Sequence, residues 1–191
     1  MIVIRRPAMF SALRTSLIVC TVMLSAAAMA ETVPERSSYR LSDYRAPTPA
    51  TVDGQKALTT AEAHNLWANK KAVFVDVLPR PPRPANLVPG TIWRDKPRND
   101  IPGSLWLPDT GYGAIPPETE AYFRRGLEQV TGGQKDKEIV FYCLRQCWMS
   151  WNATKRARSM GYTHAFWYSD GTKGWSEAGY PLEFREPLKR D

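Results

Sequence analysis

The sequence predicts an α/β domain with a central, mainly parallel sheet and helices on both of its faces. Apolar runs typical of buried parallel strands occur at residues 72–77 and 138–142. Segments with helical periodicity alternate with such runs, and most of the connections between them are short. Strands joined through helices in this way pack as a parallel sheet that is covered on both sides.

The first half of the domain begins with a short helix. Residues 59–62 read TTAE, a capping-box pattern, and Leu66 and Trp67 lie on one face of the helix that follows. A buried strand comes next. Residues 78–102 contain seven prolines, which lack a backbone donor and disfavour helix before them. We expect this Pro-rich insert to be a long irregular loop, which in compact domains is usually functional or mobile.

The second half alternates strands and helices more regularly. Pro117 marks the start of an amphipathic helix, and a Thr-Gly-Gly sequence at 131–133 ends it. Gly161 ends the next helix in the same way. The elements expected after the insert are a strand at 104–107, a helix at 118–130, a strand at 138–142, a helix at 150–160 and a strand at 165–168.

The N-terminus has the three parts of a secretory signal. Three arginines precede an apolar run at 17–27, and residues 28–30 read Ala-Met-Ala, a small-residue cleavage site. The apolar run is shorter than the roughly 20 residues that a spanning helix requires. We therefore expect cleavage of a signal peptide at 1–30, which contains Cys20, followed by export to the periplasm without a stable membrane anchor.

The remaining chain divides into three parts by composition. We expect an irregular N-terminal arm at 31–56, a folded domain at 57–183 and a polar tail at 184–191. The net charge of +7 falls when the arginines of the signal are removed. The residual charge gives no argument for a nucleic-acid partner.

Cys143 and Cys147 are the two cysteines that remain after the signal. In an oxidising compartment they form either a local disulfide or a reactive pair. Cys143 directly follows a buried strand, at the edge of a parallel sheet where ligands and chemistry gather. We expect its thiol to face unpaired amide groups at the positive end of the next helix, which would lower its pKa. Cys147 stands close enough to resolve an adduct into a disulfide.

Several motifs, in this order, resemble a rhodanese-like domain over residues 57–183. These motifs are Asp76 at a strand end, Ile101-Pro102-Gly103-Ser104, Cys143 after Phe141-Tyr142, Gly161-Tyr162, and Asp170-Gly171 with Trp175 and Ala178-Gly179-Tyr180-Pro181. A closer resemblance comes from residues 143–153, CLRQCWMSWNA, together with the Pro-rich insert and Gly111-Tyr112-Gly113. These segments look like the exported group called PQQ-dependent catabolism-associated CXXCW-motif proteins.

The resemblance implies a catalytic Cys143 that carries sulfane sulfur as a persulfide, with Cys147 as its partner. It also implies that a small sulfur or thiol substrate binds at Leu144, Arg145, Gln146 and Trp148. Rhodanese loops usually have Gly three residues and Arg five residues after the nucleophile, whereas this chain has Gln146 and Trp148. The oxyanion-binding Arg is therefore missing, which argues against thiosulfate as the substrate.

Three functions remain open. The first is sulfur transfer or thiol redox chemistry linked to periplasmic quinoprotein-dependent oxidation. The second is a non-catalytic accessory or binding module with a structural Cys143–Cys147 disulfide. In both, the implied partner is a periplasmic quinoprotein dehydrogenase or its electron-transfer partner; PQQ would belong to that partner, and no cofactor is expected here. The third is Cu(I) binding by the two thiolates with Met149, for which neither His64 nor His164 has ligand spacing.

Aromatic and acidic residues complete the expectations. Most tryptophans should be core residues, because rings at these spacings bury well. Trp148 is the exception, and we expect it at the mouth of the site, where it would line a pocket or dock a partner. Asp76, Asp100 and Asp109 are candidate acid or base groups, although a loop carboxylate is more often simply solvated.

Overall fold

The computed structural model describes residues 33–81, 84–92 and 98–190, all within one compact unit, Thr32–Asp191. The predicted signal peptide at 1–30, with Cys20, lies outside the described residues. Over the part of the chain that is described, no helix is long and apolar enough to cross a membrane.

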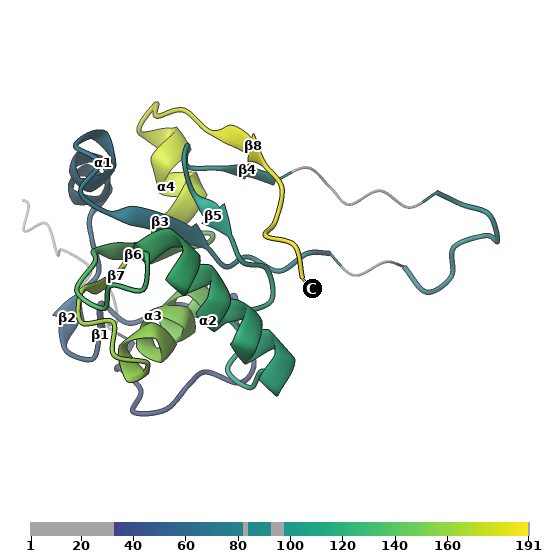
Figure 1. Ribbon diagram of the computed structural model, residues 1–191, viewed down its shortest axis with the longest axis horizontal. Coiled ribbons are helices and arrows are strands. Elements are labelled where there is room, and N and C mark those ends of the chain that lie inside the picture. Colours follow the sequence, from purple (N-terminus) through teal and green to yellow (C-terminus); the bar gives the residue numbers. More distant parts are fainter. Residues whose placement is uncertain (1–32, 82–83, 93–97, 191) are drawn as a thin grey trace, which may run out of the picture. The chain divides into compact units, whose positions relative to one another are not determined.

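The core of the unit is a four-stranded sheet in which every neighbouring pair of strands is parallel (Figure 1). Its order is β5 (Leu105–Trp106), β3 (Val73–Asp76), β6 (Ile139–Tyr142) and β7 (Ala165–Trp167). Strands β3 and β6 lie at the centre and are almost wholly buried. The predicted parallel α/β fold is thus confirmed, and the carboxyl ends of these strands share one edge.

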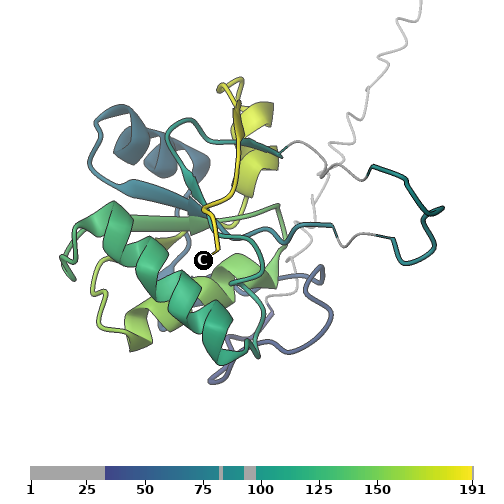
Figure 2. The same ribbon diagram turned by 45° about the vertical axis from the view of Figure 1, so that its right-hand side comes forward.

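Helices cover both faces of the sheet, two on each (Figures 1 and 2). Helices α2 (Pro117–Thr131) and α3 (Trp148–Ser159) pack on one face, and α1 (Thr60–Ala68) and α4 (Gly171–Glu177) pack on the other. Side chains alternate along the strands, as a pleated sheet requires. The clusters show this alternation: Val75 and Phe141 face α2 and α3, whereas Phe74, Val140 and Tyr142 face α1 and α4.

Local sequence signals explain where the longer helices begin and end. The capping box of α1 forms as predicted, since Thr59 accepts from the Glu62 backbone and the Glu62 side chain accepts from the Thr59 backbone. Gly132, in a left-handed conformation at φ 64°, ends α2. Helix α3 starts two residues earlier than the predicted 150, because Cys147 already acts as its N-cap.

Short elements outside the central sheet were not predicted. The expected arm contains a hairpin of β1 (Thr51–Val52) and β2 (Gln55–Lys56). The Pro-rich insert is not irregular throughout, because it ends in β4 (Arg98–Asp100), which pairs antiparallel with β8 (Glu183–Arg185). The partner of β4 lies some eighty residues away in the sequence, so no local pattern reveals the pairing.

A buried charged cluster lies where β4 meets the end of β3. Arg98 Nε donates to Asp76 Oδ2 at 2.7 Å and lies 3.0 Å from Asp100 Oδ1. Asp76 and Asp100 are fully buried, so the alternative that they are solvated loop carboxylates is wrong, and their role as acid or base groups stays a prediction. Burial, together with the neighbouring negative charge of Asp76, raises the pKa of Asp100 to about 9. Asp100 therefore keeps its proton in the folded protein at neutral pH.

This cluster should make stability depend on pH. The unfolded chain releases the Asp100 proton near pH 4, whereas the folded protein holds it, so the free energy of unfolding should fall as pH rises between these values. Asp100→Asn mimics the protonated form. We expect it to raise the free energy of unfolding at pH 8 by up to about 5 kcal/mol, because the wild type must hold the Asp100 proton there, and to have little effect at pH 4.

Urea unfolding at both pH values measures this effect, with Asp136→Asn on an exposed turn as the control. Equal destabilisation by Asp100→Asn at pH 4 and pH 8 would show that Asp100 is ionised in the fold.

Candidate functional site

The two cysteines lie where β6 passes into α3. Cys143 is the first residue after β6, and Cys147 immediately precedes the first residue of α3. Both neighbours of β6 in the sheet, β3 and β7, run parallel to it. Cys143 is therefore at the carboxyl edge of the sheet, as the sequence predicted, and in the position where parallel sheets place their functional groups.

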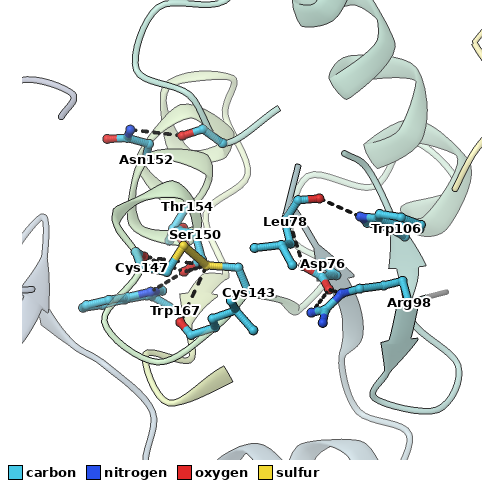
Figure 3. Close-up of a disulfide and its surroundings, with 12 residues drawn as sticks. Asp76, Leu78, Arg98, Trp106, Cys143, Cys147, Ser150, Asn152, Thr154 and Trp167 are labelled. Atoms are coloured by element: carbon cyan, nitrogen blue, oxygen red, sulfur yellow. Dashed lines mark hydrogen bonds and ion pairs between the residues drawn. A yellow bond between two sulfur atoms is a disulfide. The ribbon is translucent and has the colours of Figure 1, made fainter. Parts of the chain in front are cut away.

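The two sulfur atoms are joined in a disulfide (Figure 3). The Cα atoms of Cys143 and Cys147 are 6.5 Å apart, within the range that a disulfide spans. The exposed fractions of Cys143 and Cys147 are 0% and 1%, and both residues belong to the apolar cluster between the sheet and α2 and α3. In this state the pair is sealed from solvent.

Oxygen atoms surround the Cys143 sulfur. Ser150 Oγ lies 3.3 Å from it, and the carbonyl oxygens of Leu144 and Cys147 lie at 3.7 Å and 3.8 Å. No backbone N–H among residues 33–81, 84–92 and 98–190 donates to this sulfur. The expected ring of amide hydrogens around Cys143 is therefore wrong for the oxidised protein, because the disulfide holds the sulfur towards Cys147.

The start of α4 holds the loop from the other side. The Thr172 N–H donates to the Cys143 carbonyl at 3.0 Å, and Leu144 forms a β-bridge with Gly171. A side chain at Gly171 would collide with the Cys143 carbonyl, and its φ of 54° is also left-handed. Glycine at 171 thus allows the close approach that fixes the backbone of Cys143.

The predicted substrate-binding residues occupy different environments. Leu144 is half-buried in the apolar cluster, and Gln146 is exposed at the turn with a φ of 52°. The Arg145 guanidinium contacts Asp170 at 3.1 Å and Glu177 at 2.6 Å, so two carboxylates already neutralise it.

Trp148 does not lie at an open mouth. Its exposed fraction is 1%, and its indole N–H donates to the Pro47 carbonyl at 3.1 Å. Four other tryptophans are buried in the core, as expected for most residues of this type: Trp106, Trp151, Trp167 and Trp175.

The N-terminal arm covers the first turns of α3. The Tyr44 carbonyl accepts from the Trp148 N–H at 2.9 Å, and Tyr44 packs against the cluster that contains both cysteines. Asn152, fully buried, clamps the Arg40 backbone: it accepts from the N–H at 2.9 Å and donates to the carbonyl at 2.9 Å. The arm thus occupies the backbone N–H of the first residue of α3.

Sequence reasoning missed four residues that shape the site: Tyr44, Ser150, Asn152 and Trp167. Ser150 and Asn152 are polar residues within the first turns of α3, and polar side chains on the buried face of a helix are a detectable signal. Trp167, which donates to Ser150, and Tyr44, which accepts from the Trp148 N–H, come from distant segments and carry no local signal.

Metal ligands do not gather around the cysteines. Among the described residues, no group of three or more His, Cys, Asp or Glu side chains is placed to hold a metal ion. The two sulfurs are bonded to each other, so Cu(I) binding stays a prediction for the reduced protein only. Asp109, the remaining candidate carboxylate, is half-exposed and pairs with Arg190 at 3.1 Å.

Releasing the arm should expose the disulfide. Asn152→Ala removes the clamp on Arg40, and Gly113→Ala would place a methyl group against the Arg40 carbonyl. We expect each variant to speed reduction of the disulfide by dithiothreitol by about tenfold, because local opening becomes easier by about 1 to 2 kcal/mol. Timed alkylation and intact-protein mass measure the rate. Asn69→Ala, at an exposed helix end, is the control, and unchanged rates in both arm variants would show that the arm does not limit access.

Several solved structures are similar to this chain, although none of the curated proteins matches it. A thiosulfate sulfurtransferase from Pseudomonas aeruginosa has a TM-score of 0.45 and 16% identity, over 69% of this chain and 20% of its own length. A human single-domain sulfurtransferase has a TM-score of 0.37 and 24% identity, over 63% of this chain and 95% of its own length. The polysulfide-sulfur transferase homodimer from Wolinella succinogenes has a TM-score of 0.43 and 19% identity, over 68% of this chain and 79% of its own length.

The chain spans only a fifth of the Pseudomonas protein, so that comparison concerns one part of it. The family model described as Rhodanese-like domain matches residues 59–178, which is more than half of the chain. The matched region contains the central sheet, all four helices of the described unit and the cysteine loop. The chain therefore belongs to the rhodanese-like domain family.

Proposed function

We propose that the protein acts in sulfur transfer coupled to thiol redox chemistry, with Cys143 as its reactive thiol. The supporting observation is the disulfide itself, which joins the residue after the central strand β6 to the N-cap of α3. A second thiol at bonding distance from Cys143 suits a cycle in which the sulfur is released, because the pair can close as soon as an adduct forms.

The proposed cycle starts from the reduced protein and a persulfide donor, R–S–SH. The Cys143 thiolate attacks the outer sulfur, the donor S–S bond breaks, and the thiolate R–S⁻ leaves. The Cys147 thiolate then attacks Cys143 Sγ, the disulfide forms, and HS⁻ leaves. The two cysteines are oxidised by two electrons and the transferred sulfur is reduced to hydrosulfide. A thiol reductant returns the disulfide to two thiols.

The loop favours a donor whose recognition does not depend on a free guanidinium. Arg145, the basic residue of the loop, is engaged by Asp170 and Glu177. The position where rhodanese loops usually carry Arg is Trp148, which is buried against the arm. We propose that Leu144, Arg145, Gln146 and Trp148 shape the approach to Cys143, and that an organic persulfide or a polysulfide is a better donor than thiosulfate.

We also propose export to the periplasm and an association with quinoprotein-dependent oxidation. The signal-like pattern of residues 1–30 supports export, and so does a cysteine pair held as a disulfide. The resemblance of residues 147–151, CWMSW, to the PQQ-associated exported group supports the partner, a periplasmic quinoprotein dehydrogenase or its electron-transfer partner.

The burial of the disulfide supports a second candidate function. Both cysteines are sealed, and the arm closes the N-terminal end of α3. A permanently oxidised pair in this place would be a structural disulfide that joins the end of β6 to the start of α3. The protein would then be a non-catalytic accessory module of the quinoprotein-dependent oxidation system. The two candidates differ in whether the reduced protein takes up sulfur.

Sulfur uptake by the reduced protein should depend on Cys143. In the full chain carrying Cys20→Ser, Cys143 and Cys147 are the only thiols. We expect intact-protein mass after treatment with glutathione persulfide to show a gain of one sulfur or loss of two hydrogens, the two stages of the cycle. Cys143→Ser should show neither. No sulfur uptake by the reduced wild type, or a disulfide that resists reduction, would favour the accessory role. Equal sulfur uptake by Cys143→Ser would show that Cys143 is not the reactive thiol.

The lifetime of the adduct should depend on Cys147. Cys147→Ser removes the thiol that resolves the Cys143 persulfide, so we expect the adduct to persist at least about tenfold longer than in the wild type. The measurement is the decay of the plus-one-sulfur mass after excess donor is removed. An unchanged lifetime would remove Cys147 from the mechanism.

A further inference from the structure

Ser150 and Trp167 form a hydrogen-bonded pair directly beside the Cys143 sulfur (Figure 3). Ser150 lies in the first turn of α3, and Trp167 is the last residue of β7. The Trp167 indole Nε1 donates to Ser150 Oγ at 3.0 Å, and Ser150 Oγ lies 3.3 Å from Cys143 Sγ. Both side chains are almost completely buried, at 0% and 1% exposed. Two rigid elements thus hold one hydroxyl group against one sulfur.

The chemistry of the three groups fixes the direction of the hydrogen bonds. An indole N–H only donates, so Trp167 occupies a lone pair of the Ser150 hydroxyl and leaves its single hydrogen free. In the oxidised protein that hydrogen is donated to the Cys147 carbonyl at 3.1 Å. A disulfide sulfur is a poor acceptor, whereas a thiolate is a charged one. After reduction, the same hydroxyl can therefore rotate its hydrogen onto the sulfur of Cys143.

We propose that Trp167 and Ser150 are positioning residues that direct a hydroxyl hydrogen onto the Cys143 thiolate. This inference rests on the proposed function and deepens it, because it distinguishes the two cysteines: among the described residues, no side chain donates to the Cys147 sulfur. Cys143 is then the stabilised thiolate of the reduced pair. It is also the better leaving group when an external thiolate attacks the disulfide at Cys147.

Burial increases the stabilisation that the Ser150 hydroxyl hydrogen can give to the Cys143 thiolate. In the sealed site water does not reach the sulfur, and an unsolvated thiolate is costly without a donor. The amide ring expected from the sequence is not around the sulfur, and the Thr172 N–H is used on the Cys143 carbonyl. Of the groups in contact with Cys143 Sγ, the Ser150 hydroxyl is the one that can donate a hydrogen, and that hydrogen would favour the charged form.

The test measures the pKa of the Cys143 thiol and needs no sulfur donor. In the full chain carrying Cys20→Ser and Cys147→Ala, Cys143 is the only cysteine. The ultraviolet absorbance of the thiolate from pH 5 to pH 10, taken as the difference from the same chain carrying Cys143→Ala, gives the pKa without a reagent having to enter the sealed site. We expect Ser150→Ala to raise this pKa by about one unit, because a hydrogen bond to a charged group is lost. Trp167→Phe should raise it by a smaller amount.

The double variant Ser150→Ala with Trp167→Phe tests whether Trp167 changes the Cys143 pKa through Ser150 or independently of it. If Trp167 acts through Ser150, adding Trp167→Phe to Ser150→Ala should give no further shift. Two matched controls should leave the pKa unchanged. Thr154→Ala removes a buried hydroxyl that bonds to the Ser150 carbonyl, and Trp175→Phe removes an indole N–H that bonds to the Pro181 carbonyl.

Three results would overturn the inference: an unchanged pKa in Ser150→Ala, additive shifts in the double variant, or equal shifts in the controls. If Ser150→Ala does not fold, as judged by near-ultraviolet circular dichroism, an unchanged pKa in Trp167→Phe alone overturns it. The outcome is distinguishable from that of the proposed function. If the pKa shifts are found but the protein takes up no sulfur, the positioning role stands and the transfer cycle is wrong. If sulfur is taken up but the pKa does not shift, the transfer cycle stands and the positioning role is wrong.

Discussion

The candidate site depends on one bond, the Cys143–Cys147 disulfide, which closes the short loop between β6 and α3. The chain leaves β6, crosses the five residues 143–147 and enters α3, and a bond between Cys143 and Cys147 joins the first and last of these five. Both ends are fixed independently, by the parallel pairing of β6 with its two neighbours and by the packing of α3 on the same sheet. The sulfurs are consequently buried among apolar side chains, where a thiolate has few partners.

The two cysteines are buried, and the N-terminal arm covers the start of α3 beside them. The arm precedes the region that matches the rhodanese-like family model, residues 59–178. Its contacts with α3 are mainly backbone groups held by buried side chains, such as Arg40 on Asn152 and Pro47 on Trp148. Hydrogen bonds of this kind break one by one at small cost, which suits a cover that opens locally while the sheet stays intact.

Local sequence patterns predicted the features that are determined by neighbouring residues in the chain. The buried runs of β3 and β6, the capping box of α1 and the position of Cys143 after a strand were all readable. The pairing of β4 with β8, the buried state of Asp100 and the contact of Trp167 with Ser150 were not, because each depends on segments that meet only in the folded chain. The amide ring around Cys143 failed for a chemical reason, since the disulfide turns the sulfur towards Cys147.

The stoichiometry of sulfide release tests the central claim most directly. The reduced full chain carrying Cys20→Ser is mixed with glutathione persulfide, without added reductant, and hydrosulfide is followed with a sulfide electrode against Cys143→Ser as the blank. A cycle that ends in the disulfide predicts one equivalent of hydrosulfide per chain and the loss of both thiols. Release no greater than the blank, with both thiols still free, would contradict it.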